Sequence, residues 1–563
     1  MHVTIDGKYI ECMQGETILQ AAKKNNIDIP TLCYHSMLEP EGRCRVCLVE
    51  ANGKTTTACD TIVQDGMNII TDSEKLRLMR KDAVDLIASS VSPEVLQSEN
   101  ELTKAMQKVG LKKPSFKNYK KLEKDNSSNA VWRDNNKCIS CGRCVQSCSK
   151  VQSVNAIAFS GRSIEMQVEG VFCEQLYCTK CVSCGQCSLV CPTNAISEAN
   201  SLSIVEKHLK EKGKIKIAQI APSVRVSLGE CLGIPPGKNL ERQIAAGLKK
   251  AGFDFVFDTN FGADLTIVEE SSEFIERIRE GKKPLFTSCC PAWIDYCCQF
   301  HPELIPSLST AKSPQLMLAA MTKTHFAEKK GFSPKKIFNV SIMPCTAKKK
   351  EASLKQMGRK GLRDIDAVLT TRELGELFKR KHIDLEKIQP ADFDDPLGES
   401  TGAGAIFGAT GGVMEAALRT AYFLLEGKDL ERDEIPQVRG EKGIKEFEIM
   451  VGGKKFKTAV AHGLSNAEKL IERLKKGEEF DFIEIMACPG GCIGGGGQPK
   501  PTNWNLIQER TKAIYSIDSS KSVRKSHHNQ SVKKLYEEFL GKPGSKKAKQ
   551  LLHRTYPKKG KTF

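Results

Sequence analysis

Two cysteine runs organise the chain: CISCGRCVQSC at residues 138–148 and CVSCGQCSLVCP at residues 181–192. Both have the spacing C-x2-C-x2-C-x3-C, which is typical of [4Fe–4S] ligation. In such pairs the fourth cysteine of each run ligates the cluster of the other run. We therefore predict two clusters, one on Cys138, Cys141, Cys144 and Cys191 and the other on Cys181, Cys184, Cys187 and Cys148.

The segment between the two runs predicts a β-hairpin. AIAFSGRSIEMQV at 156–168 alternates in polarity around Ser160-Gly161, as the two arms of a hairpin do. Cys173 and Cys178 fall outside the spacing pattern, and we predict that both are packed side chains.

Residues 1–78 look like a small ferredoxin. Val3–Ile5 and Tyr9–Cys12 flank an Asp6-Gly7 turn and predict a hairpin, and Glu16–Asn25 predicts a helix. Four cysteines follow, and such a set suits a [2Fe–2S] cluster: Cys33, Cys44, Cys47 and Cys59. A structural zinc site is the alternative, because the first gap is longer than in plant ferredoxins. Cys12 lies outside this set and is predicted to be packed.

Residues 79–128 predict a spacer without redox chemistry, since they contain neither Cys nor His. The apolar positions of Leu76, Met79, Ala83 and Leu86 predict a helix at its start. The stretch 104–124 is rich in lysine and is expected to be exposed.

Composition places the chain among globular proteins. It has 563 residues, 40% apolar and 27% charged content, and no apolar run of membrane-spanning length. The N-terminus lacks a secretory signal pattern, so we predict a cytoplasmic protein; an organellar location stays open. Twenty-three cysteines then indicate metal rather than disulfides. The net charge of +17 is interpreted as a solvated basic surface or as attraction to an acidic protein partner. We see no nucleic-acid motif, and we expect neither nucleic acid nor membrane as a partner.

In the C-terminal half, strand-like and helical segments alternate. Four strands are predicted, each ending in a loop of unusual composition: Ile215–Ile220, Pro284–Phe286, Phe338–Met343 and Phe482–Met486. Open α/β sheets bind ligands beyond the carboxyl ends of their strands, so these loops could converge. Four thiols would then meet: Cys290, Cys345, Cys488 and Cys492. The glycines after Cys492 are not a phosphate loop, because no Lys-Ser/Thr follows. We expect them to let the backbone approach something bulky and inorganic.

At these residues the sequence resembles the [FeFe]-hydrogenases. The resemblance rests on TSCCPAW at 287–293, MPCTAKKKE at 343–351 and MACPGGCIGGGGQP at 486–499. RKSHHNQSVKKLYEEFLGKP at 524–543 looks like the small-subunit segment of that family, fused here to the catalytic chain. The cysteine runs and the N-terminal ferredoxin match its accessory modules.

The resemblance implies roles for individual residues. Cys290, Cys345, Cys488 and Cys492 would hold a [4Fe–4S] cluster, and Cys492 would bridge it to a two-iron unit with carbonyl, cyanide and dithiolate ligands; together these form the H-cluster. Lys348 and Ser223 would lie at the two cyanides. Met343 and Met486 would pack against the two-iron unit.

The resemblance also implies a proton route. Cys289 would face the amine of the dithiolate and relay protons to Glu270, Ser309 and Glu273, with Glu351 near the site. From the sequence alone, Glu270 and Glu273 would be interpreted as one solvated helix face.

The predicted fold is multidomain α/β and α+β. It comprises a β-grasp ferredoxin (1–78), the spacer (79–128), a bacterial-type two-cluster ferredoxin domain (129–205), a two-lobed α/β catalytic domain with the active cluster between the lobes (206–505), and the C-terminal segment (506–563). Longer family members carry a further cluster in the spacer interval, and this chain lacks its Cys and His ligands.

The predicted function is a ferredoxin hydrogenase that reversibly reduces protons to H2. An acidic ferredoxin is expected as electron partner, and maturation proteins are expected to supply the two-iron unit. A slow-turnover H2 sensor and an iron–sulfur assembly protein are the alternatives.

Overall fold

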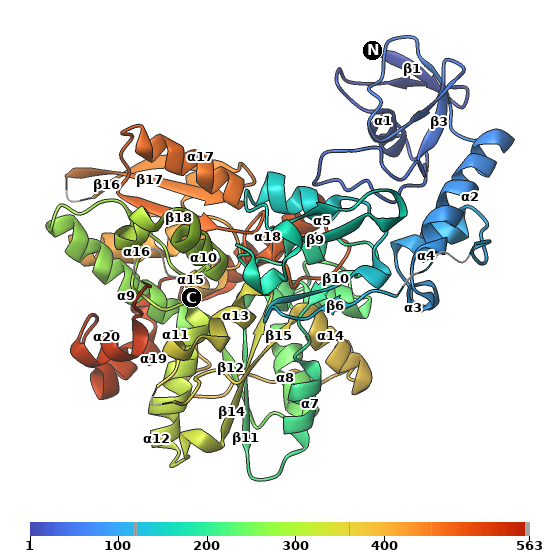
Figure 1. Cartoon of the computed structure of the whole chain (residues 1–563). Helices are drawn as coiled ribbons and strands as arrows, with labels where there is room; N and C mark the ends of the chain where they lie inside the picture. Colours follow the sequence, from blue (N-terminus) through green and yellow to red (C-terminus); the bar gives the residue numbers. More distant parts are fainter. Residues whose placement is uncertain (117–118, 120, 360, 452, 558–563) are drawn as a thin grey trace. The chain divides into compact units, whose positions relative to one another are not determined.

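The chain forms two compact units in the computed structural model, which describes residues 1–116, 119, 121–359, 361–451 and 453–557 (Figure 1). The first unit contains Met1–Lys150, Asn155–Thr179 and Val190–Ser197. The second contains Val151–Val154, Lys180–Leu189 and Glu198–Phe563. The cysteine loop at Cys181–Cys187 thus belongs to the unit that holds the catalytic half. Part of the Lys-rich stretch, residues 117, 118 and 120, lies outside the described residues.

The N-terminal ferredoxin has a five-stranded sheet in the order β2-β1-β5-β3-β4. Its elements are β1 (His2–Ile5), β2 (Lys8–Glu11), α1 (Ile18–Lys24), β3 (Leu48–Ala51), β4 (Lys54–Thr57) and β5 (Asn68–Ile70). The predicted hairpin is confirmed, because β1 and β2 pair in antiparallel fashion across Asp6 and Gly7, both at positive φ. The predicted helix is confirmed as α1, which a Thr17–Gln20 capping box starts. Cys12 is packed in the core, as predicted.

The rest of the first unit surrounds the first cysteine run. The spacer is helical, and the helix predicted at its start is confirmed as α2 (Glu74–Ser89), which α3 (Pro93–Gln97) and α4 (Glu101–Lys108) follow. Strand β6 (Lys124–Asp125) lies near the end of the spacer, and beyond it follow β7 (Val131–Asp134), α5 (Arg143–Gln146) and β10 (Ile196–Glu198). The predicted hairpin between the runs is confirmed as β8 (Ile157–Ser160) and β9 (Gln167–Gly170).

One lobe of the second unit is built on a parallel sheet in the order β12-β11-β14-β15. Its strands are β11 (Ile215–Ile220), β12 (Phe255–Asp258), β14 (Ile337–Met343) and β15 (Ala367–Thr370). Helices α7 (Leu202–Lys210), α8 (Glu241–Ala251) and α14 (Thr371–Arg380) gather on one side of it (Figure 1). Successive side chains of β11 lie on opposite faces of the sheet. Ala218 and Ile220 pack against these helices, and Ile217 packs on the other face.

The other lobe has a second sheet, ordered β13-β18-β17-β16. Its strands are β13 (Leu285–Phe286), β16 (Ile444–Val451), β17 (Lys454–His462) and β18 (Phe482–Met486). The first three in this order are parallel, and only the edge strand β16 runs antiparallel. Helices α10 (Pro291–Phe300), α16 (Gly412–Glu426) and α17 (Leu464–Lys475) belong to this lobe. The four predicted strands are therefore split, two in each sheet.

Helix α9 (Thr259–Arg279) is the central helix of the second unit, and it packs against helices from both lobes. Its neighbours are α11 (Pro314–Met321), α15 (Gly402–Ile406) and α16. Fourteen of its 21 residues are buried, including Glu269 and Glu270. A carboxylate in such a place costs free energy unless it is bonded or protonated, so these residues need a chemical explanation.

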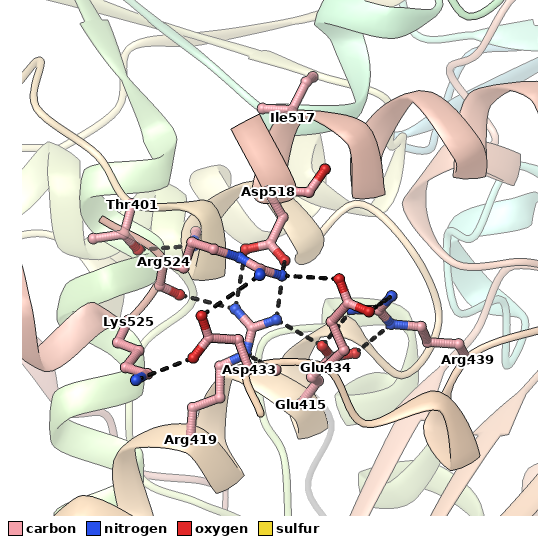
Figure 2. A network of polar contacts seen from close by, with 12 residues as sticks. Thr401, Glu415, Arg419, Asp433, Glu434, Arg439, Ile517, Asp518, Arg524 and Lys525 are labelled. Atoms are coloured by element: carbon pink, nitrogen blue, oxygen red, sulfur yellow. Dashed lines mark hydrogen bonds and ion pairs between the residues drawn. The ribbon is translucent and has the colours of Figure 1, made fainter. Parts of the chain in front are cut away.

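The C-terminal segment is anchored in the same unit. It comprises α18 (Trp504–Ser520), α19 (Gln530–Leu535) and α20 (Lys546–Leu552), and the last two pack on α9 and α11. Figure 2 shows the buried Arg419 of α16 between Glu415 and Asp518, with Nη2 to Oε1 at 2.6 Å and Nη1 to Oδ1 at 3.0 Å. Arg524 donates to the same Asp518 carboxylate at 2.6 Å. Among the described residues, no helix is long and apolar enough to cross a membrane.

Candidate active site and its accessory clusters

Four strand-end loops line one cavity in the second unit. They follow β11, β13, β14 and β18, so the convergence expected from strand-end chemistry is present. All nine residues that the sequence assigned to the metal centre and its immediate surroundings line it: Ser223, Cys289, Cys290, Met343, Cys345, Lys348, Met486, Cys488 and Cys492.

The four ligand-type thiols stand close enough to influence one another. Burial, together with the neighbouring Cys290, raises the pKa of Cys345 to about 11. Burial likewise raises the pKa of Cys290, Cys488 and Cys492. Four thiolates gathered in one cavity would need a compensating positive charge, which iron would supply.

Glycine after β18 allows the loops to close tightly. A Cβ on Gly495 would lie 2.2 Å from the Pro344 carbonyl oxygen, and one on Gly494 would lie 2.0 Å from the Pro489 carbonyl oxygen. The glycines were expected to make room for an inorganic group. Gly491 and Gly495 do line the cavity, but Gly494 and Gly496 are needed because other backbone segments approach them.

A chain of proton-carrying groups leads away from Cys289. The buried Glu270 carboxyl neighbours this thiol, accepts from the Ser288 backbone N–H at 3.3 Å, and lies beside Ser309. Ser309 Oγ then donates to Glu273 Oε2 at 2.9 Å. Burial raises the pKa of Glu270 to about 8, and its Oε2 has no hydrogen-bond partner among the described residues. The structure thus brings the four predicted route residues together in order.

Lys348 and Glu351 form a buried pair beside the cavity. Lys348 Nζ donates to Glu351 Oε2 at 2.9 Å and to the Cys289 carbonyl oxygen at 3.0 Å. Ser313 and Gln315 donate to the same Glu351 oxygen at 2.8 and 2.7 Å. This network fixes the ammonium at the cavity wall, where low dielectric strengthens its field.

The loop that carries Cys181, Cys184 and Cys187 of the second run contacts the loops that line the cavity. Thr346 Oγ1 donates to the Ser183 carbonyl oxygen at 2.7 Å, and Gln186 Nε2 donates to the Gly494 carbonyl oxygen at 2.9 Å. Burial raises the pKa of Cys184, and the Cys488 thiol is near enough to raise it further. A cluster on Cys181, Cys184 and Cys187 would therefore neighbour the central one. Cys148 belongs to the other unit, and its role as fourth ligand stays a prediction.

In the first unit the remaining ligand sets are also assembled. Cys138, Cys141, Cys144 and Cys191 line one cavity, as the crossed ligation pattern requires. In the N-terminal ferredoxin Cys33 contacts Cys44, and Cys47 contacts Cys59. One prediction is wrong: Cys173 and Cys178 are exposed, because they follow the β8–β9 hairpin on short turns rather than entering a core.

Sequence reasoning missed several lining residues. Thr259 follows β12, and Gln315 stands at the start of α11. Phe407 lines the cavity from the chain after α15. The strand-end rule could have found Thr259, whereas no local signal marks Gln315 or Phe407.

Family models match along most of the chain. They are "Iron only hydrogenase large subunit, C-terminal domain" at residues 214–496, "Iron hydrogenase small subunit" at 505–559, "2Fe-2S iron-sulfur cluster binding domain" at 1–74 and "4Fe-4S dicluster domain" at 137–195.

Whole-length relatives agree with these models. The chain is 43% identical to "NADP-reducing hydrogenase subunit HndD" of Solidesulfovibrio fructosivorans over 99% of each chain. It is 40% identical to "Iron hydrogenase 1" of Clostridium pasteurianum over 99% of this chain and 100% of the other. A solved structure described as "Stepwise [FeFe]-hydrogenase H-cluster assembly revealed in the structure of HydA(deltaEFG)" matches 64% of this chain and 100% of its own, with 43% identity and a TM-score of 0.58.

Proposed function

Because the chain belongs to the [FeFe]-hydrogenases, we propose that it interconverts protons and H2 reversibly, with an acidic ferredoxin as electron partner. Its hydrogenase activity follows from the family; the reversibility, the partner and the roles of individual residues are the proposal. We also propose a cytoplasmic location and loading of the two-iron unit by separate maturation proteins.

One observation carries the proposal: the four ligand-type thiols and a fifth thiol, Cys289, line a single cavity. The cavity also contains an unsatisfied polar group, since the fully buried Ser223 Oγ has no partner among the described residues. A hydroxyl in that state fits a ligand that accepts a hydrogen bond, such as cyanide. The residues present therefore fit the H-cluster.

The residues that line the cavity have different roles in binding the H-cluster. Cys290, Cys345, Cys488 and Cys492 would supply the thiolate ligands, and Cys492 would serve both the cubane and the two-iron unit. Soft sulfur and cyanide ligands suit low-valent iron, and the bound group supplies the site at which H2 is split or formed. Lys348 Nζ and Ser223 Oγ would donate to its anionic ligands, and Met343 and Met486 would pack against it. Glu351 orients Lys348 through their 2.9 Å contact.

Proton movement is assigned to side chains of this chain. Cys289 Sγ, in the cavity wall, would hold the proton beside the bound group and exchange it with the neighbouring Glu270 carboxyl. Glu270 passes it by way of Ser309 Oγ to Glu273, which is half-buried and leads toward solvent. A carboxyl with a pKa of about 8 can both bind and release a proton near neutral pH.

An infrared spectrum of anaerobically purified and matured protein, together with an H2 assay, tests the proposal. Carbonyl and cyanide bands with H2 evolution from reduced ferredoxin are expected. Matured protein that shows the bands but evolves H2 from no donor would contradict it.

A further inference from the structure

Arg143 occupies a position between two cluster-binding loops of the first unit. It is the first residue of α5 and stands between the ligands Cys141 and Cys144. Its side chain is only 3% exposed. A buried guanidinium has five N–H donors to satisfy, so its partners reveal which segments it joins.

On one side Arg143 bonds to the loop that carries Cys33. Nη2 donates to the carbonyl oxygens of Leu32 and Tyr34, both at 2.7 Å, and Nε donates to that of Cys33 at 3.2 Å. On the other side Nη1 donates to the carbonyl oxygen of Val190 at 3.3 Å, directly before Cys191. One guanidinium thus connects ligand loops of the [2Fe–2S] centre and of the cluster on Cys138, Cys141, Cys144 and Cys191.

The spacer completes this arrangement. Glu101, at the start of α4, accepts from Arg143 Nη1 and Nη2 at 2.8 Å each, and its own backbone N–H donates to Pro192 at 3.2 Å. A paired carboxylate allows the guanidinium to stay charged while buried. The spacer lacks cluster ligands, yet it contributes the counterion of Arg143.

Further contacts join the N-terminal ferredoxin to the domain that contains the first cysteine run. Gln146 Nε2 donates to the Glu39 carbonyl oxygen at 2.9 Å, and the Arg43 guanidinium lies 4.3 Å from the Phe159 ring centroid. Ile139, next to the ligand Cys138, packs against the apolar cluster that contains Leu32. The N-terminal ferredoxin is therefore docked on the first cysteine run rather than tethered beside it.

We propose that Arg143 is a positioning residue that sets the distance between these two centres, so that electrons pass directly from one to the other. The [2Fe–2S] centre, reduced by an external low-potential one-electron carrier, is oxidised by one electron as the cluster on Cys138, Cys141, Cys144 and Cys191 is reduced by one. No proton is transferred and no covalent bond changes. The inference rests on the assigned clusters and not on the proposed ferredoxin or proton route.

Arginine suits this task better than lysine. Its planar fork donates in several fixed directions, whereas an ammonium has three donors on a flexible stem. Arg143→Lys keeps the positive charge but leaves some of the four buried carbonyl oxygens without a partner. We expect the Cys33 loop to shift, and small misplacements of reacting centres reduce rates steeply.

Arg143→Lys and a matched control, Arg80→Lys, test the proposal in the full chain with its clusters loaded. Arg80 is also buried, and it also donates to backbone carbonyl oxygens of the N-terminal ferredoxin, those of Leu48 and Thr71. Among the described residues, however, it does not contact the domain that contains the first cysteine run. Two readouts independent of H2 turnover are used. One is the spin–spin broadening between the reduced centres in electron paramagnetic resonance; the other is the reoxidation rate of the [2Fe–2S] centre after pulsed reduction.

Arg143→Lys should weaken the broadening and slow reoxidation by roughly tenfold or more, whereas Arg80→Lys should change neither. Iron and sulfide analysis establishes that both variants retain their clusters. If Arg143→Lys loses a cluster, Glu101→Gln replaces it, and a smaller loss in both readouts is expected there. Wild-type broadening and wild-type reoxidation in the cluster-loaded variant would overturn the proposal.

Discussion

Ser309 donates a 2.9 Å hydrogen bond to Glu273 and lies beside the carboxyl of Glu270, one turn earlier on α9. Glu270 and Glu273 are three residues apart and so share one face of α9. This face packs against the segment that follows β13 instead of being exposed to solvent. The serine hydroxyl bridges two carboxyl groups that the helix alone would leave unconnected. This arrangement supports the proton route proposed above for Glu270 and Glu273.

Replacing Cys289 with alanine should separate metal binding from proton transfer. Removal of a general acid or base reduces turnover by about 10²–10⁴-fold. We expect Cys289→Ala to lose H2 evolution on this scale while keeping its iron content. Cys298→Ala removes a buried thiol of α10 that does not line the cavity and should stay active. Wild-type turnover in Cys289→Ala would remove the thiol from the route.

Cys492→Ala tests the bridging ligand. The other thiols that line the cavity are assigned to the cubane or to the proton route, so the two-iron unit should not be retained once the proposed shared thiolate is removed. The carbonyl and cyanide infrared bands should disappear, while the accessory clusters keep their paramagnetic signals. Bands of wild-type intensity would show that another residue anchors the unit.

The pKa of Glu270 predicts a pH dependence. Burial holds this pKa at about 8, so the carboxyl is protonated at pH 7 and becomes charged as the pH rises through 8. Proton delivery for H2 evolution should therefore decline above pH 8. Glu270→Gln cannot exchange a proton and should be slow at every pH, without the inflection. A wild-type pH profile in Glu270→Gln would exclude Glu270 from the route.

Ligand spacing and strand ends could be predicted from the sequence because both are local features. The cysteine runs fix their own geometry, and parallel strands bring their carboxyl ends to one edge. Tertiary contacts could not be predicted in this way. The burial of Glu270 depends on helices that pack around α9, and the contacts of Arg143 join residues more than a hundred positions apart. Cys173 resembles a core residue by type, yet a turn leaves it exposed.

The Arg419 network predicts a stability effect of Asp518. Asp518 accepts from both Arg419 and Arg524, and the side chains of Asp518 and Arg419 are fully buried (Figure 2). Asp518→Asn removes one of the two buried carboxylates that pair with Arg419, and also the carboxylate that pairs with Arg524. Breaking a buried ion pair costs about 3–5 kcal/mol. The melting temperature should fall clearly. Glu509→Gln breaks only an exposed pair with Lys512 and should change stability by less than about 1 kcal/mol. Equal melting temperatures for the two variants would contradict this account.

Ionic strength tests the proposed electron partner. The chain carries a net charge of +17, so an acidic ferredoxin should be attracted over a distance that salt shortens. The Michaelis constant for reduced ferredoxin should rise as salt increases, with little change in the maximal rate. A cationic viologen donor is the control, because the basic surface repels it and salt should not raise its Michaelis constant. A ferredoxin Michaelis constant independent of salt would mean that docking does not depend on this charge, and an acidic carrier would lose its main physical support.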